Sequence, residues 1–217
     1  MGFFDSLMDL LFPPRCAFCK SLLGRGERGM CPKCERDLPF TTNGAEQSGE
    51  FYKACIAPLY YEDNVRESII RFKFKEATAY AKLYGRLMAD CIRERYEGRY
   101  DLITWVPLSD KRRKKRGYDQ AMLLALAVAL ELGDVAVETL AKHTDVPAQS
   151  GAGDEEKRKA NISGVYRVVD EELIMGKRIL MIDDIVTTGS TLSECAYTLQ
   201  LVGAKEVICC TLACARD

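Results

Sequence analysis

The stretch RILMIDDIVTTGSTLSE, residues 178–194, decides the fold, because it joins an apolar run, an acidic pair and a turn of small residues. Four apolar residues lead directly into Asp183 and Asp184, and residues 187–191 follow as Thr-Thr-Gly-Ser-Thr. Residues 190–201 then show the apolar spacing of an amphipathic helix. This order predicts a buried strand of a parallel sheet, and ligands bind at the carboxyl ends of such strands.

The small-residue turn predicts a phosphate-binding site. It supplies backbone N–H groups, hydroxyl donors and a glycine that lets the chain approach a ligand closely. It also opens a helix whose N-terminal amides and dipole favour an anion. The candidate phosphate-binding residues are Thr187, Thr188, Gly189, Ser190 and Thr191.

The acidic pair predicts a partner that is cationic or rich in hydrogen-bond donors, because adjacent carboxylates repel each other. A ribose diol donates two hydrogen bonds, and Mg²⁺ prefers oxygen ligands. A sugar with a 5-phosphate and two hydroxyls, bound with Mg²⁺, would therefore satisfy Asp183, Asp184 and the turn together. The alternative is that an aspartate and the Thr and Ser hydroxyls only cap the helix, which explains fewer of these features.

Outward from this stretch, strands and helices alternate from residue 53 onward. We expect strands at residues 54–61, 102–106, 179–182 and 207–213, and helices at residues 65–74, 77–96, 119–132 and 190–201. This alternation predicts an α/β fold, with a mostly parallel sheet flanked by helices. The 217 residues, 47% hydrophobic and 29% charged, suffice for one such domain and a small appendage.

The N-terminal region contains two Cys-x-x-Cys pairs separated by eleven residues, Cys16/Cys19 and Cys31/Cys34. This spacing predicts a tetrahedral four-thiolate zinc site, which is structural because no coordination position stays open. A redox dithiol needs only one pair, and two disulfides are less expected in a cytoplasmic protein. We therefore expect a zinc module with an N-terminal amphipathic helix over residues 1–50, and the α/β domain over residues 51–217.

The start of the chain, MGFFDSLMDLLFPP, lacks the basic region and cleavage site of a secretory signal. The longest apolar run, residues 122–130, is too short to span a membrane. We therefore expect a cytoplasmic protein without a membrane span.

Six consecutive basic residues follow the strand expected at residues 102–106: Lys111, Arg112, Arg113, Lys114, Lys115 and Arg116. In a parallel sheet this run lies at the same edge as the phosphate-binding turn, where it could clamp a diphosphate leaving group. It could instead bind a nucleic-acid backbone, or it could be a solvated charged loop. The net charge of −1 means that any nucleic-acid affinity must come from a local patch.

The motif LMIDDIVTTGST resembles the phosphoribosyl diphosphate signature of type I phosphoribosyltransferases. The resemblance implies that Asp183 and Asp184 hold the ribose hydroxyls and that residues 187–191 hold the 5-phosphate.

Almost the whole chain resembles the competence-associated ComF family. The resemblance is carried by the cysteine quartet, the stretch VPLSDKRRKKRGYDQA, the later residues Gln149, Arg158, Asn161 and Tyr166, and the acidic signature. The family pattern Arg-Gly-Phe-Asn-Gln differs here at Tyr118 and Asp119, and Asp119 removes donors and adds charge. The segment before Gln149 also departs from the pattern.

The resemblance implies a phosphoribosyltransferase-like protein linked to DNA uptake in natural transformation. An enzyme of this kind would displace diphosphate at the anomeric carbon, but no general base is evident. The single histidine, His143, lies in a polar segment, so catalytic residues stay unassigned. The alternative is a non-catalytic protein that senses phosphoribosyl diphosphate, or that binds single-stranded DNA or a helicase of the uptake machinery.

Overall fold

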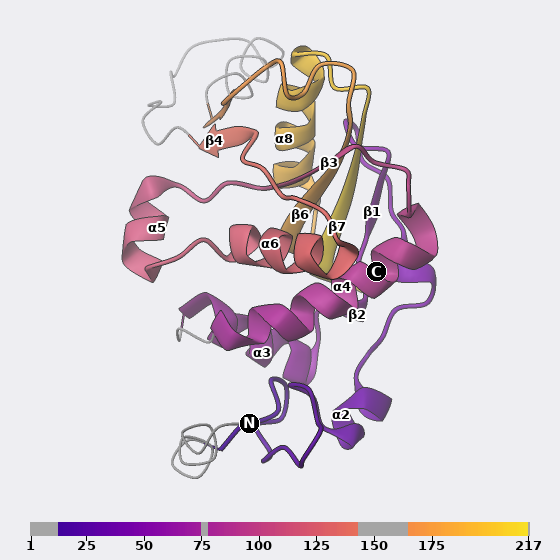
Figure 1. The fold of residues 1–217 in the computed structure, drawn as a ribbon, viewed down its shortest axis with the longest axis vertical. Coiled ribbons are helices and arrows are strands. Elements are labelled where there is room, and N and C mark those ends of the chain that lie inside the picture. The colour runs from indigo at the N-terminus through magenta and orange to yellow at the C-terminus, as the bar shows by residue number, and fades with distance from the viewer. Residues whose placement is uncertain (1–12, 75–77, 143–164, 217) are drawn as a thin grey trace.

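A five-stranded parallel sheet forms the centre of the protein (Figure 1). The computed structural model describes residues 13–74, 78–142 and 165–216. The strand order is β1-β7-β6-β3, and β2 also pairs with β7. The strands are β1 (Ala54–Ile56), β2 (Leu59–Tyr60), β3 (Leu102–Trp105), β6 (Arg178–Val186) and β7 (Glu206–Cys214). The predicted α/β fold with a parallel sheet is confirmed.

The strand expected over residues 54–61 is interrupted. Both β1 and β2 pair with β7, through Cys55 opposite Cys209 and Leu59 opposite Ala213. Pro58 lies between them and has no N–H to donate to a neighbouring strand. The segment is therefore an edge strand with a break at the proline.

Strand β6 is longer than the sequence predicts, because it continues through the acidic pair to Val186. Its register places Asp183 opposite Thr211 and Val186 opposite Cys214 of β7. The expectation of a strand over residues 179–182 is corrected here: β7 stays extended and apolar, so the ladder continues beyond the first polar residues. The aspartates lie within the strand.

Helices cover both faces of the sheet (Figure 1). Leu180 and Ile182 of β6 pack into the apolar cluster shared with the helices of one face, and Ile179 and Met181 pack into the cluster of the other. The first face carries α3 (Asp63–Phe74), α4 (Ala81–Tyr96) and α6 (Gln120–Leu132), and the second carries α8 (Ser190–Leu201). Helices α4 and α6 approach closely at Gly85, where a Cβ would lie 2.5 Å from the Cβ of Ala127.

The basic run forms a helix, α5 (Asp110–Arg116), and not the loop that the charge pattern suggests. The hydroxyl of Ser109 accepts a hydrogen bond from the backbone N–H of Arg112 (3.4 Å), which caps the helix start. Gly117 ends the helix with a left-handed φ of 81°. These caps allow a short helix despite its like charges.

A two-stranded antiparallel sheet lies apart from the main sheet and was not expected from the sequence. It consists of β4 (Leu140–Lys142) and β5 (Tyr166–Val168). The remaining short elements are α2 (Pro32–Asp37), η1 (Asn43–Ala45) and η2 (Thr78–Tyr80). No helix within the described ranges is long and apolar enough to cross a membrane.

Several expectations concern positions outside the described residues. They are the N-terminal amphipathic helix and the polar-segment residues His143, Gln149, Arg158 and Asn161.

Candidate functional site

The two aspartates of β6 belong to different faces of the sheet, because successive side chains of a strand alternate. Asp184 forms an ion pair with Lys73 at the end of α3, with 2.8 Å between Oδ1 and Nζ. Oδ1 of Asp183 accepts a hydrogen bond from the backbone N–H of Asp184 (2.8 Å). Burial raises the pKa of Asp183, and the negative charge of Asp184 raises it further. A cation or a hydroxyl donor at this position would therefore stabilise the ionised carboxylate.

Both aspartates line a cavity of about 240 Å³ at the carboxyl edge of the sheet. Its walls bring together the acidic pair, Thr191 at the start of α8, and two arginines of α5. Its charged residues are four cations, Lys73, Arg112, Arg116 and Lys142, and three carboxylates, Asp119, Asp183 and Asp184. Residues that are far apart in the sequence thus create a polar site that can hold an anion and a metal ion or diol together.

The small-residue turn is only partly directed at this cavity. Gly189 is the N-cap of α8 with φ 71°, and a Cβ there would collide with the hydroxyl of Tyr52. A glycine N-cap has no side chain to satisfy the first-turn amides, which favours an external acceptor. The hydroxyls of Thr188 and Ser190 bond to each other at 2.9 Å. Thr191 lines the cavity, whereas Thr187 lines a separate hollow.

Helix α5 divides the basic run. Arg112 and Arg116, one turn apart, line the cavity. Nη1 of Arg116 donates to Oε1 of Gln120 (2.6 Å), and its guanidinium lies 4.7 Å from the ring centre of Phe74. Arg113 instead pairs with Asp110 at 2.9 Å. The other members of the run, Lys111, Lys114 and Lys115, are exposed to solvent.

Asp119 accepts two backbone hydrogen bonds. Its carboxylate oxygens receive the N–H of Met122 (3.1 Å), which caps α6, and the N–H of Leu108 (2.9 Å). The two contacts use different oxygens, Oδ1 and Oδ2, so a carboxylate accepts both, whereas an asparagine amide has only one acceptor oxygen. Asp119 thus fixes α6 against the segment that follows β3.

The sequence interpretation did not identify Lys73, Gln120 and Lys142 as members of this site. Lys142 lies at the end of β4, where its Nζ donates to the hydroxyl of Tyr166 on β5 (3.0 Å). Tyr166 was noted in the family pattern, but no role was assigned to it. In the sequence, Lys73 is a cation near the end of the helical pattern expected at residues 65–74. No other local feature distinguishes it from a surface lysine.

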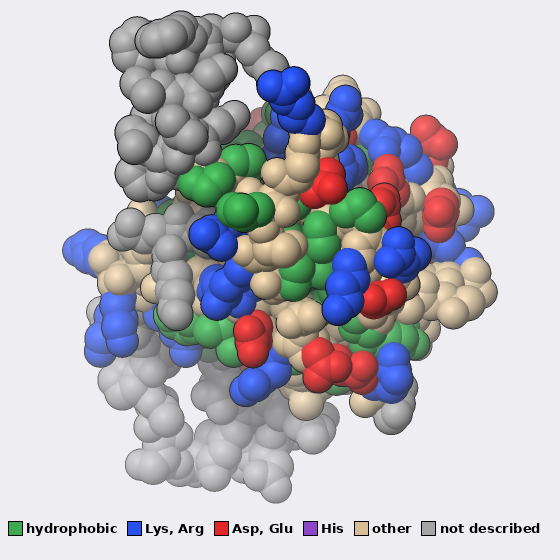
Figure 2. Space-filling view, turned by 90° about the horizontal axis from the view of Figure 1, so that it is seen from below, with side chains coloured by type: hydrophobic (Ala, Val, Ile, Leu, Met, Phe, Trp, Pro, Cys, Tyr) green, Lys and Arg blue, Asp and Glu red, His purple; other side chains and the backbone are tan. Residues whose placement is uncertain are grey.

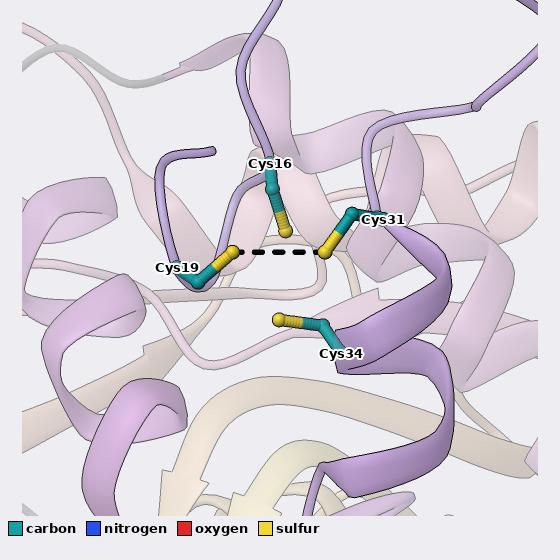
Figure 3. A group of neighbouring side chains, drawn as sticks. All are labelled: Cys16, Cys19, Cys31 and Cys34. Carbon is teal, nitrogen blue, oxygen red and sulfur yellow. Dashed lines mark hydrogen bonds between the residues drawn. The ribbon is translucent and has the colours of Figure 1, made fainter. Parts of the chain in front are cut away.

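The four cysteines form one compact group (Figure 3). Their sulfur atoms all lie within 4.8 Å of one another, and the Sγ atoms of Cys19 and Cys31 are 3.6 Å apart. Zn–S bonds of about 2.3 Å in a tetrahedron require sulfur separations of about 3.8 Å. Disulfide sulfurs lie at about 2.05 Å, and all four cysteines are free. The cluster therefore fits a structural zinc site.

The local backbone explains this convergence. Cys16 and Cys19 flank a tight turn, Cys31 is the N-cap of α2, and Cys34 lies within α2. Burial raises the pKa of Cys19, but hydrogen bonds with Ser21, Cys34 and Cys31 together outweigh this effect and lower it to about 6. Burial raises the pKa of Cys34, so its thiolate needs a cation to form.

Comparisons with known proteins agree with both parts of the chain. The family described as the phosphoribosyl transferase domain matches residues 114–217. The family described as the double zinc ribbon domain matches residues 7–49. The first contains the acidic pair and the turn, and the second contains the cysteine quartet.

Three curated relatives resemble nearly the whole chain. Competence protein F of Haemophilus influenzae is 24% identical over 217 residues, covering 89% of this chain and 93% of that protein. DNA utilization protein YhgH of Escherichia coli is 26% identical over 219 residues, covering 91% and 96%. Competence protein ComFC of Bacillus subtilis is 24% identical over 198 residues, covering 85% and 77%.

Proposed function

We propose that this chain binds phosphoribosyl diphosphate with Mg²⁺. The chain belongs to the ComF family of phosphoribosyl transferase-domain proteins with an N-terminal zinc ribbon. The supporting observation is that one cavity is lined by Asp183, Asp184, Thr191, Arg112 and Arg116. The carboxylates would hold the ribose hydroxyls and Mg²⁺, and the start of α8 would hold the 5-phosphate. The proposal divides the chain into a zinc module, residues 1–50, and a ligand-binding domain, residues 51–217.

The diphosphate would lie beside α5. Arg112 and Arg116 present two guanidinium groups, and Lys73 of α3 and Lys142 of β4 add ammonium groups to the same lining. Fixed cations of this kind stabilise the charge that develops when diphosphate leaves the anomeric carbon. A second hollow of about 520 Å³ shares Leu108, Asp119 and Lys142 with the cavity, and it offers room for an acceptor.

Calorimetric titration tests the ligand. We expect one phosphoribosyl diphosphate per chain in the presence of Mg²⁺, and weaker binding of ribose 5-phosphate, which lacks the diphosphate. Equal affinity for the two ligands would contradict the role of the four cations. Diphosphate release on addition of nucleophilic acceptors would show a transferase, whereas binding without release from any acceptor would show a sensing role.

The relatives support a role in DNA uptake or use, because two carry competence names and one is called a DNA utilization protein. On the face seen in Figure 2, Lys and Arg alternate with Asp and Glu among the described residues, so this face offers no continuous basic surface. Lys111, Lys114 and Lys115 instead form an exposed basic group on α5. We propose that this group contacts single-stranded DNA or an uptake helicase.

Fluorescence anisotropy with a labelled oligonucleotide tests the DNA contact. Replacing Lys111, Lys114 and Lys115 by Gln should weaken binding and reduce its dependence on salt concentration. The control replaces two lysines elsewhere, Lys177 and Lys205. Unchanged binding in the α5 variant would contradict the DNA contact on α5.

A further inference from the structure

The last turn of α3, residues 71–74 with the sequence Arg-Phe-Lys-Phe, contacts both functional regions of the molecule. Arg71 reaches the cysteine module, and Lys73 reaches the acidic pair. In Figure 1, α3 lies between the N-terminal module and the sheet. This short segment is therefore a direct physical connection between the zinc site and the ligand cavity.

Arg71 holds the turn between the first two cysteines. Its Nη2 donates hydrogen bonds to the carbonyl oxygens of Ala17 (2.7 Å) and Phe18 (2.8 Å), the two residues between Cys16 and Cys19. The guanidinium is buried, with 9% of the side chain exposed, and its only carboxylate contact among the described residues is a 3.4 Å pair with Glu67. A buried guanidinium used mainly on backbone carbonyls serves to fix the position of that backbone.

A second α3 side chain supports the same contact. The hydroxyl of Ser68 donates to the carbonyl of Ala17 and lies 2.5 Å from the hydroxyl of Tyr84 on α4. The cysteine turn is thus attached to α3 by two residues, Ser68 and Arg71, that are three positions apart and share one helix face.

At its other side the same turn of α3 meets the cavity. Lys73 forms an ion pair with Asp184. The guanidinium of Arg116 lies over the ring of Phe74, 4.7 Å from the ring centre. The carbonyl of Phe72 accepts a hydrogen bond from the hydroxyl of Tyr118, between α5 and α6. Three consecutive residues therefore contact the acidic strand, the basic helix and the segment that joins α5 to α6.

These contacts couple the two sites because a helical turn moves as a unit. Arg71 and Lys73 are two residues apart, which corresponds to a rise of about 3 Å along the helix axis. Zinc fixes the turn that carries Cys16 and Cys19, because its thiolate ligands must converge on one ion. We propose that Arg71 is a positioning residue, through which the zinc-bound module sets the position of Lys73 against Asp184 and so raises the affinity for phosphoribosyl diphosphate.

This proposal rests on the proposed function for its ligand, and thermodynamic reciprocity supplies its test. If zinc raises the affinity for the ligand, the ligand must raise the affinity for zinc by the same factor. Zinc affinity is measured by competition with a chelator, with and without saturating phosphoribosyl diphosphate and Mg²⁺. We expect the ligand to tighten zinc binding in the native chain by about fivefold or more, the lower end of ordinary couplings between sites.

Two variants of α3 isolate the contribution of Arg71. Arg71→Lys keeps the charge, but its shorter side chain lacks the guanidinium Nη2 that donates to both the Ala17 and Phe18 carbonyls, and it should reduce the coupling to within about twofold. Arg66→Lys is the matched control, because Arg66 is an exposed arginine of the same helix. It should keep the full coupling. If Arg71→Lys does not retain zinc, the measurement on the native chain decides alone.

The outcomes that overturn this proposal differ from those that overturn the ligand assignment. A native chain that binds phosphoribosyl diphosphate without any change in zinc affinity overturns the coupling and leaves the ligand assignment intact. A native chain that binds no ligand removes the ligand assignment, and hydrogen exchange then decides. Zinc-loaded Arg71→Lys should exchange amides of residues 183–191 faster than zinc-loaded Arg66→Lys, and equal exchange overturns the proposal.

Discussion

The cysteine module and the cavity at the sheet edge are assembled in opposite ways. The four sulfur atoms come from a segment of 19 residues, Cys16 to Cys34, where one tight turn and the start of helix α2 bring them together. The cavity instead takes Lys73, Arg112, Lys142 and Asp183 from four separate segments. A local site depends on its ligands and its ion, whereas a long-range site depends on how well the helices around it are packed and capped.

The largest effect is expected where the local site loses a ligand. Cys31→Ser should abolish zinc binding and unfold the N-terminal module, because structural zinc contributes roughly 10–16 kcal/mol to the folding of such modules. Metal analysis should fall from about one zinc per chain to none, and proteolysis should cleave the N-terminal segment. Cys91→Ala, a buried cysteine outside the quartet, is the control and should retain zinc. A folded, metal-free native chain would contradict the assignment.

A smaller effect is expected where the cavity loses a charge partner. Lys73→Met leaves Asp184 without its cation in a largely buried pair, with exposed side-chain fractions of 20% and 13%. The free energy of unfolding should fall by about 2 kcal/mol, between the values for surface and fully buried pairs.

The matched control for Lys73→Met is Lys53→Met. Lys53 pairs with Glu206 at 2.6 Å, but 60% of its side chain is exposed. Loss of that pair should cost less than about 1 kcal/mol. Urea denaturation of both variants measures the difference, and equal losses would show that burial does not strengthen the Lys73 pair.

The arginines of the basic helix α5 should differ in their contribution to ligand binding: those that line the cavity should contribute, and Arg113 should not. Arg112→Ala should weaken the binding of phosphoribosyl diphosphate about tenfold, equivalent to about 1.4 kcal/mol. Arg113→Ala should change it less than twofold, because Arg113 is paired with Asp110 and does not line the cavity. Calorimetric titration of the two variants gives the comparison. Equal losses would indicate a diffuse charge effect of the whole run.

The smallest effect is expected at the cap of α6. Asp119→Ala removes acceptors for Met122 and Leu108 and should lower the free energy of unfolding by about 1 kcal/mol. Asp119→Asn keeps a side-chain oxygen and should lose less. Thermal denaturation of the two variants tests this order, and the reverse order would contradict the acceptor role of the carboxylate.

The same contrast explains how far the sequence could predict the structure. The cysteine spacing predicted the quartet, because a local pattern contains all of its geometry. The bounds of α8 were predicted correctly from its apolar spacing and from Gly203, which follows its end. The length of β6 and the interruption at Pro58 were not predicted, because both depend on pairing with β7. The paired residues of β6 and β7 are more than twenty positions apart in the chain.

The cavity was predicted only at its centre. The acidic pair, Thr191 and two of the three arginines of α5, Arg112 and Arg116, line it, as their places after consecutive parallel strands indicated. Lys73 and Lys142 could not be identified, because each looks like an ordinary surface lysine until the fold brings it to the cavity. The helical form of the basic run was also missed, and it decides which arginines face the cavity and which face solvent.

The central claim is that the acidic pair of β6 holds a phosphorylated pentose. It is tested most directly by calorimetric titration of phosphoribosyl diphosphate and Mg²⁺ into the native chain and into Asp183→Asn with Asp184→Asn. Each lost contact with a charged group is worth about 1.5–3 kcal/mol, so the double variant should bind at least a hundredfold more weakly. Its far-ultraviolet circular dichroism should stay native. Unchanged affinity in the folded double variant would contradict the account.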